Sequence, residues 1–110
     1  MATGRLASPI QVGTVLLTNT TLYTVPTGYY SVFNVSLTNT SSSTVTIRLA
    51  LASTTTPGTA EYIEYDTPIV AKGVFERTGL VAQAGVNIVC IANTGAAVNA
   101  TVYGIETSTS

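Results

Sequence analysis

The most regular feature of the chain is an alternation of apolar and polar residues with a period of two. Over residues 30–38 this alternation places Phe33, Val35 and Leu37 on one face and Asn, Ser and Thr residues on the other. Successive side chains of a β-strand point to opposite faces, whereas an amphipathic helix needs apolar residues every three or four positions. Since no stretch of useful length has the helical spacing, the pattern predicts an all-β protein.

A second stretch, residues 44–52, alternates as cleanly. Four of its apolar residues are expected to face the core: Val45, Ile47, Leu49 and Leu51. Ala50 is expected to face outward. We predict that 30–38 and 44–52 form an antiparallel hairpin with one buried face. Residues 86–92 are apolar on both faces, which predicts a central strand.

Turn residues separate these stretches, because Gly and Pro favour backbone conformations that interrupt strands. The sequence Asp66-Thr67-Pro68, for example, is expected to end a strand at Tyr65. The expected strands are residues 10–17, 21–25, 30–38, 44–52, 61–65, 69–71 with 74–81, 86–92 and 98–106. About eight short strands with this spacing are typical of a single antiparallel β-sandwich, either jelly-roll or immunoglobulin-like.

With 110 residues the chain has the size of one domain. Residues 1–9 are interpreted as an extended N-terminal arm, 10–106 as the sandwich and 107–110 as a flexible tail. The arm offers two apolar points, Leu6 and Ile10, and one charge, Arg5. Such a segment cannot fold alone, so it either frays or is captured by a neighbouring protein, and we favour capture.

Charged residues make up only 8% of the chain, against roughly 25% in an ordinary soluble domain. The net charge is -1 and the four basic residues are scattered, which argues against nucleic acid and membrane surfaces as partners. Thr is the most frequent residue. A hydroxyl costs far less to bury than a charge, so a surface of this kind favours contact with other proteins.

Candidate chemistry is sparse. His is absent and Cys90 is the single cysteine, so neither a Ser-His-Asp triad nor a structural zinc site can be built. Glu61, Glu64 and Asp66 lie close together, and alternation would place only Glu64 and Asp66 on one face. We interpret them as charges on a solvated edge strand. We therefore expect no enzyme, no catalytic residues, no metal and no cofactor.

Three residues are candidates for an interface. Tyr29 and Tyr30 are adjacent, so one should lie in the core and the other outside, where Tyr is a common interface anchor. Arg77 is a candidate bidentate partner for a carboxylate, either within the chain or across a subunit boundary. Together with Arg5, Leu6 and Ile10, these residues form the predicted interface.

An ordered series of segments resembles a pattern in small virion proteins of tailed bacteriophages, including cyanophages. The segments are Leu22-Tyr23-Thr24-Val25-Pro26-Thr27-Gly28, Leu37-Thr38-Asn39, Glu61-Tyr62-Ile63-Glu64-Tyr65, Gly73-Val74-Phe75-Glu76-Arg77-Thr78-Gly79-Leu80 and Ala84-Gly85. The resemblance covers about residues 22–106. It implies capsid decoration (cement) proteins, head fibres or tail components, many of which are β-sandwiches that assemble as trimers.

The resemblance, the short length and the lack of fibre-like repeats lead us to expect a capsid decoration protein. It would fold in the host cytoplasm, form a homotrimer and bind the outside of the virion across subunits of the major capsid protein. The alternative is a tail or fibre module that binds a glycan or protein of the host surface. That alternative predicts an exposed pocket with aromatic residues such as Tyr62, Tyr65 or Tyr103.

Overall fold

The computed structural model describes residues 3–5, 10–12, 20–93 and 97–108. Over these residues the chain forms nine strands and one short 3-10 turn, Thr59–Glu61. The strands are β1 (Thr3–Arg5), β2 (Ile10–Val12), β3 (Thr20–Thr24), β4 (Tyr29–Asn39), β5 (Val45–Ala52), β6 (Tyr62–Ile69), β7 (Val74–Ala82), β8 (Asn87–Ala92) and β9 (Val98–Ser108). The all-β prediction is confirmed.

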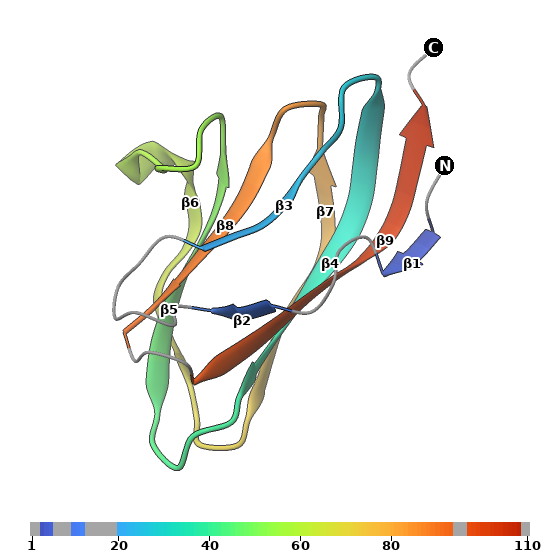
Figure 1. Cartoon of the computed structure of the whole chain (residues 1–110). Helices are drawn as coiled ribbons and strands as arrows, with labels where there is room; N and C mark the ends of the chain where they lie inside the picture. The colour runs from blue at the N-terminus through green and yellow to red at the C-terminus, as the bar shows by residue number, and fades with distance from the viewer. Residues whose placement is uncertain (1–2, 6–9, 13–19, 94–96, 109–110) are drawn as a thin grey trace.

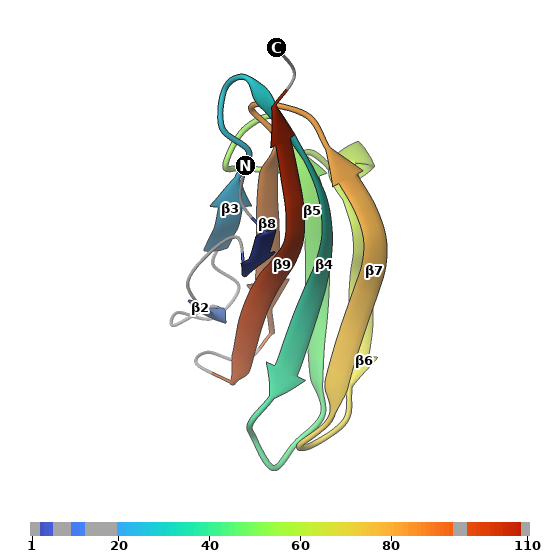
Figure 2. The ribbon, with the colours of Figure 1, turned by 90° about the vertical axis from the view of Figure 1, so that its right-hand side faces the viewer.

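The strands form two antiparallel sheets that pack face to face as a sandwich (Figure 1). The five-stranded sheet has the order β1-β9-β4-β7, with β2 also paired to β9. Figure 2 shows β9, β4 and β7 of this sheet side by side in front of the other layer. The four-stranded sheet behind it has the order β3-β8-β5-β6.

The pairing follows one rule: the first half of the chain pairs with the second half in reverse order. β5 pairs with β6, β4 with β7, β3 with β8 and β2 with β9. A long antiparallel hairpin rolled into two sheets has the connectivity of a jelly roll. The strand order in the two sheets differs from that of an immunoglobulin fold. Of the two types of sandwich that the sequence predicts, the structure therefore has the jelly roll.

The predicted hairpin between 30–38 and 44–52 is wrong. β4 lies in the five-stranded sheet and β5 in the four-stranded sheet, so the two strands face each other across the core. Both strands have one apolar face, as expected. A period-two pattern shows which face of a strand is buried, but it does not show whether the next strand pairs with it or packs against it.

The core lies between the two inner faces. Phe33, Val35 and Leu37 of β4 are buried as predicted, and all six residues of β8 are buried, as expected for a central strand. Ala50 is on the outer face as predicted, since Leu49 and Leu51 on either side of it pack in the core, but it is fully buried there because Val89 and Tyr62 flank it on neighbouring strands. β6 begins opposite Ala50, so Leu51 has no neighbour on that side and is only half-buried.

The sequence Asp66-Thr67-Pro68 does not end a strand. β6 runs through it, and Pro68 is tolerated because β6 is an edge strand that needs no further hydrogen bond from that residue. The register shifts between Ile47 and Leu49, and Asp66 takes a positive φ of 53°. The turn signal therefore marks a β-bulge inside a longer strand.

The boundaries at both ends differ from the expected ones. Residues 3–5 form β1 on β9 of the same chain, so part of the expected free arm belongs to the sheet. β2 begins at Ile10 as expected, while the rest of the predicted strand 10–17 lies outside the described residues. β9 continues to Ser108, so it includes the first half of the expected tail.

Asn39 ties the two sheets together at the end of β4. Its side chain is fully buried, and Nδ2 donates to the carbonyl oxygens of Ser43 (2.8 Å), Ile69 (3.0 Å) and Val70 (3.2 Å). Its Oδ1 accepts from the backbone N–H of Ser41 at 2.9 Å, which shapes the turn between β4 and β5. The side-chain amide of Asn39 thus forms hydrogen bonds with the turn between β4 and β5 and with the end of β6.

Replacing Asn39 with Ala should therefore destabilise the fold by about 2–3 kcal/mol, because several buried polar groups lose their partner. Chemical denaturation with urea would measure the change in the free energy of unfolding. Asn99→Ala is the matched control, since Asn99 is an exposed residue of β9. It should change stability by less than about 0.5 kcal/mol. Equal effects of the two variants would contradict the assigned role of Asn39.

Candidate interaction surface

Arg77 forms an ion pair that links the two sheets along one open side of the sandwich. Its guanidinium forms an ion pair with the carboxylate of Glu64, and its Nη1 also donates to the carbonyl oxygen of Ile63 at 3.3 Å. Arg77 is on β7 and Glu64 on β6, so the pair joins the edges of the two sheets. The structure shows the intrachain form of the predicted ion pair. A role of Arg77 at a subunit boundary stays a prediction.

The register of the two edge strands brings the Arg77 and Glu64 side chains together. Arg77 lies opposite Val35 and Glu64 opposite Leu49, both fully buried residues. The two charged residues therefore occupy inward-facing positions at the rim of the core. Inward-pointing charge on an edge strand discourages pairing with the edge of another sheet. It also makes β6 and β7 poor candidates for contact through their backbones.

A second ion pair lies beside the bulge of β6. The bulge places both Tyr65 and Asp66 opposite Arg48. The guanidinium of Arg48 lies 4.1 Å from the centre of the Tyr65 ring and donates to Asp66 at 2.7 Å and 3.4 Å. This hydrogen bond is the main reason why the pKa of Asp66 is lowered. A cation over an aromatic face adds a further favourable contact.

The three neighbouring carboxylates do not form one site. Glu61 accepts from the backbone N–H of Gly58 (2.9 Å) and of Ser53 (3.0 Å), and these bonds lower its pKa. Glu64 and Asp66, expected on one face, bind different arginines because the bulge interrupts the alternation. Within the described residues, no group of three metal-ligating side chains of the His, Cys, Asp and Glu types comes together.

A buried carboxylate lies between the sheets. Glu106 of β9 is 6% exposed and accepts hydrogen bonds from the hydroxyls of Tyr23 and Ser31, the latter at 3.3 Å. Burial, followed by the bond and the charge of Glu106, raises the pKa of Tyr23 well above its usual value of 10.0. Burial likewise raises the pKa of the Cys90 thiol, to about 12, so that it stays protonated and unreactive at neutral pH.

An apolar surface crosses the outer face of the five-stranded sheet. Val32 of β4 lies directly opposite Ile105 of β9 on one side and Val81 of β7 on the other. Their exposed fractions are 44%, 51% and 62%. Tyr30, two residues before Val32 on the same face, is 38% exposed. We call Tyr30, Val32, Val81 and Ile105 the Val32 patch.

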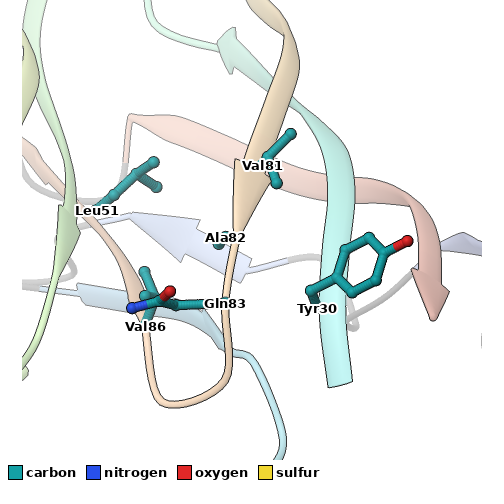
Figure 3. A pocket seen from close by; sticks show the side chains of 6 residues that line it. All are labelled: Tyr30, Leu51, Val81, Ala82, Gln83 and Val86. Carbon is teal, nitrogen blue, oxygen red and sulfur yellow. The ribbon is translucent and has the colours of Figure 1, made fainter. Parts of the chain in front are cut away.

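The Val32 patch borders an open hollow of about 310 Å³. The residues that line the hollow are Tyr30, Leu51, Val81, Ala82, Gln83 and Val86 (Figure 3). It forms where β6 has not yet begun, so that Leu51 has no neighbouring strand on the side away from β8. Tyr30 and Val81 belong both to the patch and to the rim of the hollow, so the two features form one surface.

The predicted interface residues are only partly brought together. Tyr30 is the outer of the two adjacent tyrosines and belongs to the Val32 patch, while Tyr29 is half-buried and packs against the core. Arg5 lies in β1 opposite Tyr103, and Ile10 begins β2. Leu6 lies outside the described residues. Their roles at an interface stay predictions.

The aromatic residues expected for a glycan pocket are divided between the sheets. Tyr62 and Tyr65 of β6 meet edge to face, with ring centres 5.3 Å apart. Tyr103 of β9 belongs to the other sheet, where its hydroxyl donates to Glu76 at 2.6 Å. The three rings therefore do not line a common pocket. The hollow described above contains one aromatic residue, Tyr30.

Comparison with known proteins adds no relative: the chain matches no family model, no curated protein and no solved structure. Within the described residues, no helix has the length and apolar character needed to cross a membrane. The class that the structure itself defines is a single antiparallel β-sandwich with jelly-roll connectivity.

The Arg77–Glu64 pair should show a coupling free energy of about 1 kcal/mol in a double-mutant cycle with Arg77→Met and Glu64→Gln. The Glu64 side chain is only 20% exposed, so the pair is screened less than one in open solvent. Unfolding by denaturant of the wild type, both single variants and the double variant gives this value. A cycle on Arg48 and Asp66, whose carboxylate is 53% exposed, is the control and should give a weaker coupling. A larger value for the control would contradict the prediction.

The buried Tyr23–Glu106 pair predicts a loss of stability at alkaline pH. Because the folded-state pKa of Tyr23 is raised, its contribution is fully present below pH 10.0 and declines as the pH rises toward the folded-state value. The free energy of unfolding, measured as a function of pH, should therefore fall above pH 10.0. The pKa of Tyr103 is also raised, by its bond to Glu76, and adds to the decline.

Tyr23→Phe isolates the contribution of Tyr23. It should cost about 1–3 kcal/mol at neutral pH, because Glu106 loses a buried hydrogen bond, and it should flatten the alkaline decline. Tyr65→Phe is the control, since Tyr65 is 55% exposed. This variant should keep the decline of the wild type. A Tyr23→Phe variant whose pH dependence matched the wild type would show that another group causes the decline.

Proposed function

We propose that the chain is a structural protein of a tailed-phage virion that decorates the outside of the capsid and stabilises the shell by binding across subunits of the major capsid protein. The observation that carries the proposal is the low charge of the sandwich, whose Val32 patch would join the copies of the oligomer while its uncharged polar surface contacts the shell. An exposed, contiguous apolar surface on a small domain is typical of a protein-protein contact site. The resemblance of the sequence to small phage virion proteins supports the same class.

The physical basis of the proposed activity is burial of surface. A standard interface removes roughly 800 Å² of each partner from water, and its strength depends on how well the central residues pack. The outer face of the five-stranded sheet has Thr, Ser and Asn residues around the Val32 patch, which lose little on desolvation. Repeating the contact over a shell multiplies its effect through avidity.

The proposal includes a homo-oligomer, a trimer, as the form that binds the shell, assembled in the host cytoplasm. The role of the N-terminal arm in this proposal differs from the one expected from the sequence. Since residues 3–5 pair with β9 of the same chain, deletion of residues 1–9 would remove a strand of the sheet as well as any contact with a neighbour. A deletion therefore does not separate attachment from folding, and point variants on the outer face do.

The alternative, a tail or fibre module that binds a glycan or protein of the host surface, has the Tyr62–Tyr65 pair in its favour. Tyr65 is 55% exposed at the edge of the four-stranded sheet. Arg48 covers one face of its ring, so that face is not free to stack on a sugar. The apolar surface on the other sheet favours decoration over this alternative.

Imaging and mass spectrometry of purified particles of the phage that encodes the chain test the proposal. Many symmetry-related copies on the capsid exterior are expected, and particles without the protein should rupture at a lower temperature or osmotic stress. Purified protein added back should restore their resistance. Copies found only at the tail, or binding on a glycan array, would favour the alternative. Absence from the particles would reject both.

A further inference from the structure

We propose that the Val32 patch is the surface through which a second copy of this chain binds. The inference deepens the proposed function, since it assigns the self-contact of the oligomer, yet it concerns purified protein alone. It starts from the distribution of exposed apolar side chains. Seven large ones are exposed among the described residues, and four of them form the patch. The other three, Tyr65, Val70 and Val74, lie on β6, on the turn before β7 and at the far end of β7.

The patch is apolar in a continuous row across three strands. Ile105, Val32 and Val81 occupy directly paired positions on neighbouring strands, about 5 Å apart. Three β-branched side chains standing side by side form a flat apolar strip with little conformational freedom to lose on binding. Water leaves such a strip favourably when a second flat apolar surface covers it.

Charge favours another copy as the occupant. The patch itself contains no charged residue. Glu76, on the same outer face but farther along β7, accepts a hydrogen bond from Tyr103. With a net charge of -1, two copies repel each other weakly when they approach. A partner that was strongly charged would find no complementary charge on the patch.

Shape favours another copy as well, because a protruding ring and a recess occupy the same surface. Tyr30 stands at the rim of the hollow of about 310 Å³. A closed apolar cavity of about 150 Å³ already binds benzene, so the hollow can accept a phenol ring. In a closed ring of three copies, each copy turns one side of its contact surface toward one neighbour and the other side toward the next. With the three-fold axis near Val81, Tyr30 of each copy meets the hollow of the next.

The expected extent of the contact defines a control. A standard interface takes roughly 800 Å² from each partner, a disc of about 16 Å radius around Val32. This disc covers the row of three strands and the hollow. Val74 lies seven residues before Val81 on β7, about 23 Å away, and falls outside it. Val74 is 63% exposed and Val81 is 62% exposed, so the two valines differ mainly in position.

The test compares Val81→Asp with Val74→Asp by sedimentation equilibrium of the purified protein from micromolar to millimolar concentrations. The wild type should self-associate. Val81→Asp should raise the dissociation constant at least about tenfold, because a carboxylate would be buried in the apolar contact. Val74→Asp should stay within about twofold of the wild type. Circular dichroism and thermal unfolding establish that both variants fold.

Val81→Thr gives a second reading with minimal disturbance, since Thr has the shape of Val and differs by one hydroxyl. It should weaken self-association less than Val81→Asp and more than Val74→Asp. A wild type that remains monomeric over the whole range overturns the inference. So does a Val81→Asp variant that associates as the wild type does, or equal weakening by Val81→Asp and Val74→Asp.

Failure of this inference and failure of the proposed function give different results. Self-association through the patch without any binding to phage particles rejects decoration and supports the contact between copies. A monomer that still decorates particles, and loses this binding on Val81→Asp, assigns the patch to the shell and overturns the self-contact.

Discussion

The contact between the inner faces of two apolar sheets is the constraint on which the rest of this structure depends. Phe33, Val35 and Leu37 of β4 belong to one core cluster with buried residues of β5 and β8, which lie in the other sheet. With few charges in the chain, this contact has to supply most of the stability. The polar groups at its margins are then satisfied locally: Asn39 at one end, Glu106 between the layers and Arg77 with Glu64 along the open side.

The sequence predicts strands well because burial on one face leaves a period of two, as at Phe33, Val35 and Leu37. It also predicts the central position of β8, whose residues are apolar on both faces. It does not predict pairing. In a rolled hairpin only β5 and β6 are neighbours both in the chain and in a sheet, so local reasoning joins β4 to β5 and is wrong. The bulge at Asp66 likewise resembles a turn until its partner strand is known.

The candidate surface could be predicted only in part. Tyr30 is recognisable as the outer of two adjacent tyrosines, since alternation requires that one of them leave the core. Val81 and Ile105 give no such signal, because an isolated valine or isoleucine in a strand is more often buried than exposed. They become a surface only when β9 and β7 are placed on either side of β4. Contact sites that several distant strands build together are invisible to local patterns.

The order of the strands in the five-stranded sheet also bears on the timing of assembly in the cell. The ribosome makes β4 first, β7 next and β9 after both, and β4 must wait for both neighbours. While β9 is still being translated, Val32 lacks Ile105 beside it. Nascent chains on one messenger would therefore carry an unfinished Val32 patch, and the proposed contact between copies would form only after each polypeptide has completed this sheet.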